Sequence, residues 1–599
     1  MALVLVATFY FYRGSLNNGF VNWDDEVYVL ENPDIGSTDG WFKRVVSLNY
    51  HPVTMISLAM NYEKPAEGEE PDATPFHRTN LIFHLLNTLL VFLFVMLLTR
   101  NKALIAIATA ILFGLHPMHV ESVAWISERK DVLYVFFFLL GLISWFHYRH
   151  GKQKNLFYLL SIVFFVLSCL SKAMAVVFPI VLLLIDYFEG RILRTKFSVE
   201  QKVQKRPLIP LKAITEKLPH LAIALLFGLI AVDVQGGGNF YGFFNIEIQD
   251  KAIAKFDAFT IWQRVMFASY GFVMYIVKLI WPVGLVTFYP YPTLKEINNI
   301  EYTAMPFIAM AIVGFAIYMF RKNKWITFGV MFYLITVALV LQFLSVGKVI
   351  MADRYTYLPY VGLGILLGYG LYRLTEKNRS LNTPVAVFIG ALGLFWGYKT
   401  SEAVEVWESG ETLWTQVLEH YPMTYEAYTN RGNLRGKEGR VQGALEDFKI
   451  AIQIKDSDPE ILKSLGNAYG SLNQYEESVK AFNKAIELKP NDYSYYLNRG
   501  VTHGRVGKDS LALSDFENAL RLSPSWEKVG ILNYIVTAAF QARQNQKGID
   551  ALIRLTELQP SNVNLYQRLY QVYTQLGDTE NASRMEQKLR EMGANPIPQ

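Results

Sequence analysis

GNAYGSLNQYEESVKAFNKAIELKP, residues 466–490, sets the structural class of the C-terminal third of the chain. Its first glycine, its phenylalanine, its last alanine and its proline return at steps of 34 residues. The recurring positions are Gly432, Gly466 and Gly500, then Phe448, Phe482 and Phe516, then Ala451, Ala485 and Ala519, and finally Pro490 and Pro524. A fixed period of this length predicts an array of similar structural units that stack on one another.

These residue types at this period are the tetratricopeptide signature, in which each unit is a helix–turn–helix. The first clear unit begins near Tyr425 and two degenerate units follow the third, so we expect residues 425–599 to form an α-solenoid. Residues 401–424 are expected to be a helical connector. The repeated small and aromatic residues are expected to be core. The candidate contacts for an acceptor polypeptide then lie on the concave face, at Asn430, Asn467 and Asn498.

Residues 1–400 carry nearly all the apolar excess of a chain that is 52% hydrophobic with a mean hydropathy of +0.19. A membrane-spanning helix needs about 20 apolar residues. The candidate segments are 1–13, 80–99, 103–115, 132–147, 156–171, 173–188, 219–234, 262–285, 303–320, 325–346, 357–372 and 384–400. The sequence therefore predicts an all-α protein, with a polytopic membrane domain over 1–400 followed by the repeats.

Positive loops between the apolar runs predict the topology. The basic 189–218 loop marks the cytoplasmic side, which leaves the acidic 14–79 loop, the 116–131 loop and the repeat domain outside. The predicted topology places the N-terminus inside and the repeats outside, which requires an odd number of membrane crossings. Twelve crossings are even in number, so we expect about eleven spans, with 262–285 or part of 156–188 not crossing the membrane. The net charge of +5 is small and its cations lie in short loops, which excludes a nucleic-acid partner.

The first outward loop carries three consecutive carboxylates, Asp24, Asp25 and Glu26, directly after a span. Like charges crowded near a low-dielectric surface repel one another, which raises the pKa of at least one carboxyl group. A carboxylate with a pKa near neutrality is suited to act as a general base. A solvated acidic cap on a loop or helix start is the alternative interpretation.

The third loop reads HPMHVESVAWISERKD at 116–131. His116, His119 and Glu121 suggest a metal site, but their spacing matches no zinc motif, and we expect no metal. Arg129 and Lys130 are candidates to bind phosphate, because a guanidinium fork suits phosphate oxygens. Contact with lipid headgroups is the alternative role for these two cations.

Two further cations are candidates for the same site. Lys172 lies between two apolar runs, where an ionisable side chain indicates function unless it only caps a turn. Arg354 and Tyr357 lie in another outward loop. The acidic and basic groups thus fall on one predicted face, which suits a sugar carried on a lipid phosphate.

The order of these motifs resembles the transmembrane and tetratricopeptide-repeat-containing proteins, O-mannosyltransferases of the GT-C fold, over nearly the whole chain. Each motif is weak alone, and their common order is specific. The motifs are Asp24-Asp25, Tyr50-His-Pro-Val-Thr54, His77 with Asn80, HPMHVESVA at 116–124, Arg129-Lys130-Asp131, Leu-Ser-Lys172, Arg354-Tyr-Thr-Tyr-Leu-Pro359 and the terminal repeats.

The resemblance implies a protein O-glycosyltransferase that uses a polyprenyl- or dolichyl-phosphate sugar, with mannose or another hexose transferred and the repeats recruiting the acceptor. Asp25 or Asp24 would take the proton from an acceptor Ser or Thr hydroxyl, with inversion at the sugar. No cofactor or metal is implied. The substrate or lipid phosphate would be bound by Arg129, Lys130, Arg354, His51, His116, His119, Glu121, Lys172 and Tyr357.

Two departures from the family pattern bear on the donor. His51 stands where the family carries an arginine, which leaves a weaker or titratable phosphate contact, and Ala173 stands where relatives carry an acid. We expect a bacterial inner-membrane protein rather than one of the endoplasmic reticulum, with its repeats on the periplasmic or exoplasmic side. The alternative functions are a non-enzymatic membrane-anchored scaffold for an envelope complex and a lipid-linked oligosaccharide ligase.

Overall fold

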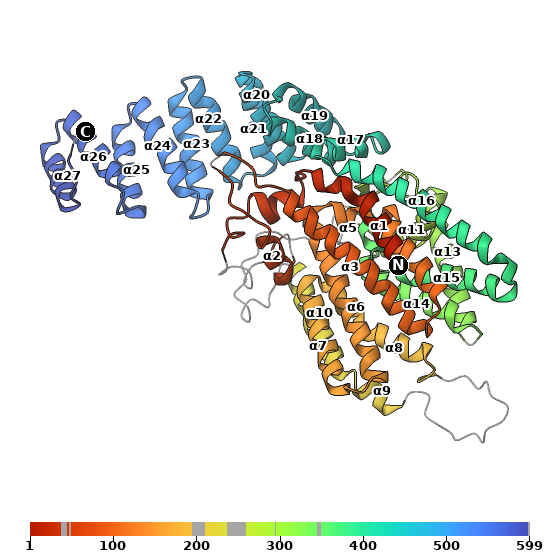
Figure 1. Cartoon of the computed structure of the whole chain (residues 1–599). Coiled ribbons are helices and arrows are strands. Elements are labelled where there is room, and N and C mark those ends of the chain that lie inside the picture. The colour runs from red at the N-terminus through yellow and green to blue at the C-terminus, as the bar shows by residue number, and fades with distance from the viewer. Residues whose placement is uncertain are drawn as a thin grey trace. The chain divides into compact units, whose positions relative to one another are not determined.

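The computed structural model describes residues 1–37, 45–46, 49–66, 68–193, 210–235, 259–293, 295–320, 322–343 and 349–596. The chain divides into two compact units, Met1–Pro422 and Met423–Gln599 (Figure 1). Most of the basic 189–218 loop lies outside the described residues.

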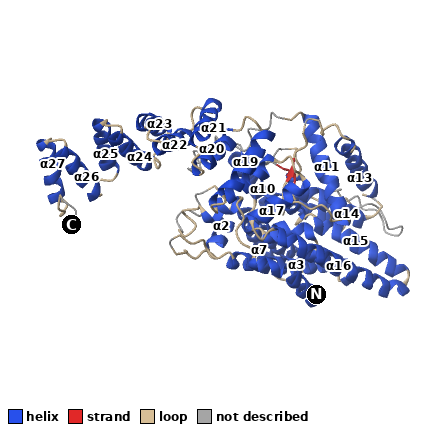
Figure 2. Ribbon diagram, turned by 90° about the horizontal axis from the view of Figure 1, so that it is seen from above, coloured by secondary structure: helices blue, strands red, loops and turns tan. Residues whose placement is uncertain are grey.

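The first unit is helical. Its helices are α1 (Ala2–Tyr12), α2 (Pro52–Ala59), α3 (Thr74–Thr99), α4 (Ala103–Leu115), α5 (Val120–Ala124), α6 (Arg129–His150), α7 (Lys154–Ser171), α8 (Phe178–Phe188), α9 (Leu211–Thr215), α10 (Leu218–Gln235), α11 (Ile261–Ile280), α12 (Ile300–Thr303), α13 (Met305–Met319), α14 (Lys324–Val337), α15 (Tyr360–Lys377), α16 (Asn382–Val406) and α17 (Gly410–His420). Two short strands, β1 (Tyr289–Pro290) and β2 (Val349–Met351), pair antiparallel. Figure 2 shows helix throughout both units, with strand only at this pairing in the described residues.

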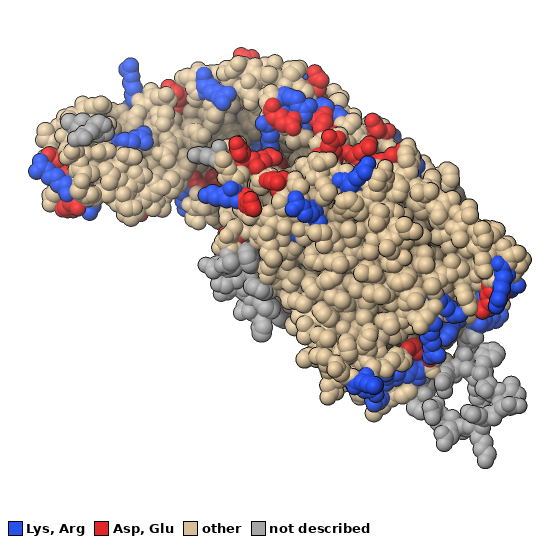
Figure 3. All heavy atoms as spheres, in the orientation of Figure 1, with Lys and Arg blue, Asp and Glu red and all other residues tan. Residues whose placement is uncertain are grey.

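Each of the twelve apolar runs contains a helix. Five described helical stretches are long and apolar enough to cross a membrane, and α4 with the turns after it makes a sixth if this bent pair is one span. The five are Thr74–Thr99, Ile126–His150, Lys154–Ser171, Ile300–Met319 and Arg379–Val406. Figure 3 shows a broad belt of the first unit that carries almost no charged side chains on the face in view. The multi-span helical membrane unit is thus confirmed, whereas the count of eleven spans stays a prediction.

Small residues allow the membrane helices to pack closely. A Cβ atom on Gly368 of α15 would lie 2.8 Å from Ile105 Cα of α4, and one on Gly364 would lie 3.2 Å from Thr109 Cα. Backbones that approach this closely gain dispersion contacts, which drive helix association where no water is expelled. The α4–α15 contact therefore depends on the glycines and holds the segment before α15, which carries Arg354, against the third loop.

The predicted connector, 401–424, is helical in the structure. Its first part continues α16, and its second part is α17, which belongs to the first unit. Trp414 Nε1 of α17 donates to Asn22 Oδ1 of the first loop at 3.1 Å, and Gln416 Nε2 donates to the Leu285 carbonyl at 3.0 Å. Helix α17 thus holds the first loop in place.

The second unit consists of five helix pairs, as the repeat predicts. The pairs are α18 (Tyr425–Lys437) with α19 (Val441–Ile454), α20 (Pro459–Ser471) with α21 (Tyr475–Leu488), α22 (Tyr493–Arg505) with α23 (Asp509–Leu522), α24 (Lys528–Gln541) with α25 (Asn545–Leu558), and α26 (Val563–Gln575) with α27 (Thr579–Glu591). The α-solenoid is confirmed for this unit.

The repeated glycine and phenylalanine contact each other within each pair. A Cβ atom on Gly466 of α20 would lie 2.8 Å from a ring carbon of Phe482 on α21. The equivalent distances are 2.7 Å from Gly432 to Phe448 and 2.7 Å from Gly500 to Phe516. Glycine is therefore required where the aromatic ring packs flat on the facing backbone, and this contact explains the period of 34.

We predict that Gly466→Ala destabilises the α20–α21 pair by about 1–3 kcal/mol, because the added methyl forces the Phe482 ring out of its place. The measurement is hydrogen exchange of α20 and α21 peptides in the full chain. The control is Gly530→Ala in α24, where nothing lies within 4 Å of the new Cβ. This control should be neutral or stabilising, since alanine favours a helix over glycine. Equal exchange rates in both variants would contradict the packing explanation.

Candidate functional site

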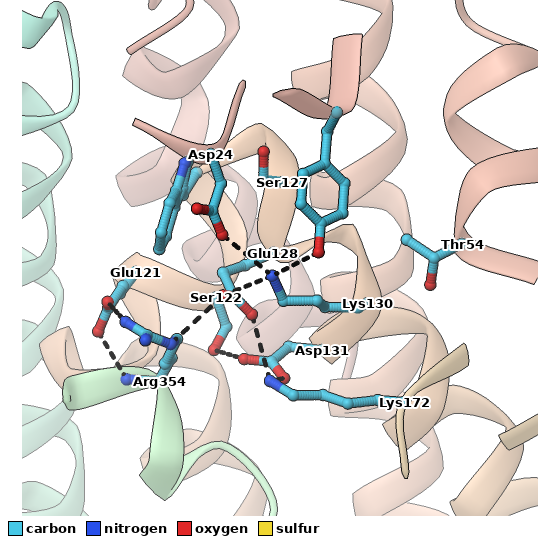
Figure 4. A network of polar contacts seen from close by, with 12 residues as sticks. Asp24, Thr54, Glu121, Ser122, Ser127, Glu128, Lys130, Asp131, Lys172 and Arg354 are labelled. Atoms are coloured by element: carbon cyan, nitrogen blue, oxygen red, sulfur yellow. Dashed lines mark hydrogen bonds and ion pairs between the residues drawn. The ribbon is translucent and has the colours of Figure 1, made fainter. Parts of the chain in front are cut away.

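Five segments of the first unit meet at one polar cluster, which Figure 4 shows from close by. They are the loop between α1 and the π-helical turn Glu26–Leu30, helix α5, the turn Ile126–Glu128 with the start of α6, the junction between α7 and the turn Ala173–Val177, and the turn Asp353–Thr356 after β2. Each segment brings charged side chains, so residues far apart in the sequence form a single ionic network.

Glu128 lies at the centre of this network. Its Oε1 is 3.1 Å from Lys130 Nζ and 3.3 Å from Arg354 Nε, and its Oε2 is 3.3 Å from Lys172 Nζ. Because Glu128 is only 1% exposed, its charge depends on these cations rather than on water. One carboxylate therefore joins three elements of the membrane unit.

Three other carboxylates complete the network. Asp24 Oδ2 lies 3.7 Å from Lys130 Nζ, and Asp131 Oδ1 lies 2.5 Å from Lys172 Nζ. Glu121 forms an ion pair with the guanidinium of the Asp353–Thr356 turn. The structure therefore brings the first-loop acid and three of the predicted cations together, with four carboxylates facing three cations.

Two of the cations retain hydrogen-bond donors. An ammonium group has three N–H donors, and Lys172 uses two of them, on Glu128 and Asp131. In Arg354, Nε and Nη1 contact carboxylates, while Nη2 contacts no acceptor among the described residues. Lys172 and Arg354 could therefore each donate to a bound anion without first breaking an ion pair.

A small pocket opens beside Lys172. Its polar side comes from the segment before α2 and from the end of α7, and its apolar side comes from α10. The lining residues are Asn49, Tyr50, His51, Cys169, Lys172, Ala173, Phe227, Ile230, Ala231 and Val234. A cation beside an apolar wall suits a ligand that carries an anionic group next to a hydrocarbon chain, but this pocket, at about 20 Å³, would have to widen to hold a phosphate.

Asp25 is buried and bound to the third loop. Its Oδ2 accepts from the Val21 N–H at 3.1 Å, and its Oδ1 accepts from the Ser127 N–H at 3.0 Å and from the Ser127 hydroxyl. Burial raises the pKa of Asp25 to about 6, and the Asp24 charge adds only a minor part. The expected rise in the pKa of a first-loop carboxyl group is present, but the reason that we gave for it was wrong. The main cause is the loss of water on burial, rather than repulsion within the acidic triplet.

Arg129 points away from the ionic network into a cage of neutral acceptors. Its five N–H groups donate to Asn80 Oδ1, to the carbonyl and hydroxyl of Ser57, to Asn61 Oδ1 and to the Phe76 carbonyl. The side chain is 0% exposed. All five N–H groups are thus occupied in this arrangement, and Arg129 fastens α6 to α2 and α3.

His51 stacks on Tyr28 with ring centroids 5.2 Å apart and is 2% exposed. Burial, together with the charges of Lys130 and Lys172, lowers the pKa of His51 to about 3. This lowered pKa favours the neutral imidazole and does not favour the titratable phosphate contact that we considered at this position. His51 nevertheless lines the pocket beside Lys172.

Two other predicted polar residues of the third loop, His116 and His119, and Tyr357 from the loop of Arg354 face the protein interior. His116 Nε2 is 3.1 Å from the Leu279 carbonyl, and His119 Nδ1 is 2.8 Å from the Phe113 carbonyl. The Tyr357 hydroxyl is 2.9 Å from His84 Nδ1 and accepts from Asn87 Nδ2 at 3.3 Å. These contacts order the helices under the ionic network, so a direct substrate contact by these three residues has no support in the geometry.

An aromatic cluster holds the network from the side of the first loop. Trp23 stacks on Trp125 with ring centroids 4.6 Å apart, and Trp125 stacks on Trp407 at 5.3 Å. The Arg354 guanidinium lies 5.4 Å from the Trp125 ring centroid, within cation–π range. The indoles thus fix the first loop and one of the cations in the same position.

Sequence reasoning missed three functional candidates. Glu128 and Asp131 were considered only as neighbours of the two cations, although two cations between two carboxylates in Glu128-Arg-Lys-Asp131 are themselves a signal of ion pairing. Asp353 was also missed: it accepts from the Tyr289 hydroxyl at 2.8 Å, and burial raises its pKa to about 7. Only the β1–β2 pairing shows that Tyr289 and Asp353 meet.

The candidate acceptor contacts of the repeats lie on the first helices of three consecutive pairs. Asn430 is on α18, Asn467 on α20 and Asn498 on α22. Asn467 is exposed, whereas Asn430 and Asn498 are half-buried. The described residues hold no group of three or more His, Cys, Asp or Glu side chains placed to bind a metal ion.

Comparison with known proteins yields one family model and several relatives. The model described as a TPR repeat matches residues 466–507. Protein O-mannosyl-transferase TMTC1 of Homo sapiens is 25% identical over 78% of this chain and 56% of the relative. Protein O-mannosyl-transferase TMTC4 of Homo sapiens is 24% identical over 72% and 63%, and Protein O-mannosyl-transferase F38B6.6 of Caenorhabditis elegans is 24% identical over 74% and 61%.

Solved structures match only a part of the chain. The crystal structure of YrrB, described as a TPR protein with an unusual peptide-binding site, is 18% identical, covers 30% of this chain and 91% of that chain, and has a TM-score of 0.27. The alignments span 56% to 63% of the length of the three relatives given above. The resemblance drawn from the motifs is confirmed: this chain is a sequence relative of the TMTC protein O-mannosyltransferases and carries a TPR repeat.

Proposed function

We propose that the chain is an integral membrane protein O-glycosyltransferase that moves a hexose from a lipid-phosphate carrier to Ser or Thr side chains. The observation that carries the proposal is the composition of the Glu128 network. It holds a partly exposed carboxylate, Asp24, and two cations with unused N–H donors, Lys172 and Arg354. The names of the sequence relatives support the same class and favour mannose as the sugar.

Asp24 is the proposed base, because a base needs a lone pair that the acceptor hydroxyl can reach. Its side chain is 26% exposed and its ion pair with Lys130 is long, at 3.7 Å. Asp25 is only 1% exposed and both of its oxygens accept bonds from the protein. We therefore assign Asp25 the role of positioning the loop that carries Asp24.

Lys172 and Arg354 are the proposed phosphate contacts. Lys172 lines the pocket whose other wall is the apolar face of α10, where Phe227 and Ile230 would contact the hydrocarbon of the carrier. Arg354 would approach the phosphate from the Glu128 side with its Nη2 group. The distribution of donors supports this pair over Arg129, whose N–H groups are all occupied.

The transfer balances without a cofactor. The acceptor oxygen forms a bond to the anomeric carbon as the bond from that carbon to the phosphate oxygen breaks, and the hydroxyl proton passes to Asp24. The electron pair leaves on the phosphate, which departs as an anion and needs no proton. Attack opposite the leaving group inverts the anomeric centre, by the logic of inverting glycosidases.

The repeats are the proposed acceptor-recruiting unit, on the periplasmic or exoplasmic side of a bacterial inner membrane, with a polyprenyl-phosphate sugar as donor. Asn430 on α18 and Asn498 on α22 are 68 residues apart, twice the repeat period, and Asn467 lies on α20 between them. Side-chain amides can hydrogen-bond an extended polypeptide backbone, which carries both donors and acceptors. The repeats would then raise the local concentration of acceptor for the membrane unit.

The first test compares Asp24→Asn with Asp25→Asn. We expect Asp24→Asn to lower kcat for sugar transfer by about 10²–10⁴, the usual contribution of a general base. Asp25→Asn should cost about tenfold to a hundredfold, through a less ordered loop. The measurement is mannosyl transfer from a synthetic lipid-phosphate donor to a Ser/Thr peptide by the purified full chain. Full activity in Asp24→Asn would contradict its role as base.

The pH profile of transfer should follow Asp25. With its pKa raised to about 6, Asp25 loses its charge as the pH falls through this value, which weakens its bonds to Ser127 and lowers activity. The raised pKa means that folding favours the protonated form, so this group does not itself destabilise the fold at lower pH.

Asp25→Asn should remove the fall in transfer rate near pH 6. A fall in transfer rate caused by Asp353, whose pKa is raised to about 7, should remain. Transfer rate and thermal midpoint are measured together across this range in both proteins. A step near pH 6 that persists in Asp25→Asn would show that another group causes it.

Two substitutions distinguish the proposed phosphate contact of Lys172 from the proposed structural role of Arg129. They are Lys172→Gln and Arg129→Lys. Lys172→Gln should weaken binding of polyprenyl phosphate about tenfold or more, because a charged donor is lost. Arg129→Lys keeps the charge but cannot satisfy all the acceptors of the cage, so it should lower the free energy of unfolding by about 3 kcal/mol. Donor titrations below the thermal midpoint of each variant provide the readout. Equal loss of donor affinity in folded Arg129→Lys would place Arg129 at the phosphate after all.

A further inference from the structure

A second polar pocket lies at the other end of the same helices that build the Glu128 network. Helix α6 begins at the network and ends at His150, and α3 begins near it and ends at Thr99. A helix of 26 residues such as α3 is about 39 Å long, so this pocket lies at the opposite membrane face from the network. Its volume is about 740 Å³.

The end of α3 and four further segments contribute to this pocket. Arg100 and Lys102 come from the α3–α4 turn, Phe146 from α6, and Phe188 from the end of α8. Lys324 comes from the first turn of α14. The pocket therefore combines three cations with the apolar ends of membrane helices, and Figure 3 shows Lys and Arg side chains gathered along this edge of the first unit.

Within the part of the chain that the structure describes, Arg100, Lys102 and Lys324 form no ion pair with a carboxylate, although the Glu189 charge acts on Lys324 from a longer distance. The acid in the pocket wall, Glu189, is 2.7 Å from His150 Nε2. Three positive charges that face a shared cavity repel one another, and a bound anion would relieve this repulsion.

The backbone also fixes these cations in place. Arg100 ends α3 in the left-handed region, at a φ of 53°, and its N–H donates to the Leu97 carbonyl at 3.3 Å. A residue with a β-carbon adopts this region at a cost. Lys324 Nζ donates to the Phe188 carbonyl at 3.0 Å and Lys102 Nζ donates to the Tyr372 hydroxyl at 2.6 Å. Each ammonium group therefore uses one donor within the protein and keeps others for a ligand.

We propose that this pocket binds the phosphate of an anionic amphiphile, with Arg100, Lys102 and Lys324 around the phosphate and Phe146, Phe188 and Trp325 against its hydrocarbon. Basic pockets between membrane helices are suited to anionic head groups. Phe188 and Trp325 contact each other edge to face at 4.8 Å, which gives the site a firm apolar wall. The site does not depend on the proposed transferase activity.

The test is native mass spectrometry of the full chain, stripped of lipid and titrated with phosphatidylglycerol, phosphatidylcholine or inorganic phosphate. We expect at least tenfold tighter binding of phosphatidylglycerol than of phosphatidylcholine. Arg100→Gln with Lys324→Gln should weaken phosphatidylglycerol binding about tenfold or more. Leu97→Trp, which fills the pocket without a change of charge, should weaken the binding of the lipid more than that of free phosphate.

The control is Lys152→Gln with Lys154→Gln, which removes two exposed charges near the same end of α6 but outside the pocket. This pair should retain phosphatidylglycerol. Tighter binding of inorganic phosphate than of lipid by the wild type would identify free phosphate as the source of the anion. Equal binding of both lipids, or equal loss in the control pair, would overturn the proposal.

Discussion

The contacts of Glu128 with Lys130, Lys172 and Arg354 are the interaction on which the candidate site depends. A buried carboxylate is costly unless cations and hydrogen bonds replace its water. Here the replacements come from the start of α6, the end of α7 and the turn after β2, so the network can form only when these elements are in place. The buried carboxylate therefore requires a fixed arrangement of charges around it, and this arrangement favours a site that is organised before its substrate binds.

The elements around the network explain how this arrangement is held. Arg129 joins α6 to α2 and α3 through neutral acceptors, while its neighbour Lys130 faces the carboxylates. Asp25 ties the first loop to Ser127, and the indoles of Trp23 and Trp125 stack over the same junction. A hydrogen bond of Asp25, an aromatic stack of Trp23 and the ion pair of Asp24 therefore hold the first loop against the network, and together they keep Asp24 near Lys130.

The sequence predicts the repeats well because their determining contacts are local. Gly466 meets Phe482 within one helix pair, so a single period contains both partners. The apolar runs likewise predict helices, since a helix satisfies its own backbone in a membrane. The count of spans does not follow from composition in the same way, because several of the helices are short and bent.

The candidate site was only partly predictable. The residues Asp24, Lys130, Lys172 and Arg354 stood out because charges beside apolar runs are expensive. Which of two adjacent cations faces the network depends on the helix register, so the sequence could not separate Lys130, which meets the carboxylates, from Arg129, which meets neutral acceptors. The neutrality of His51 and the raised pKa of Asp353 come from burial, which the sequence around each residue does not reveal.

The two ends of the membrane unit differ in a way that bears on function. At one end carboxylates outnumber cations around Glu128, whereas at the other the three cations of the α3–α4 turn and α14 share a pocket with one described carboxylate, Glu189. An anion that binds by charge alone would favour the pocket of the α3–α4 turn and α14. A donor can bind at the Glu128 network only if it makes additional contacts, namely those of its hydrocarbon with the apolar wall of α10 and those of its sugar near Asp24.

The most direct test of this account is a cryo-electron microscopy structure of the full chain with a polyprenyl-phosphate sugar bound. The account predicts the donor phosphate within hydrogen-bond distance of Lys172 Nζ and Arg354 Nη2, with the sugar facing Asp24. Donor density confined to the opposite membrane face, with the Glu128 network unchanged and empty, would contradict it.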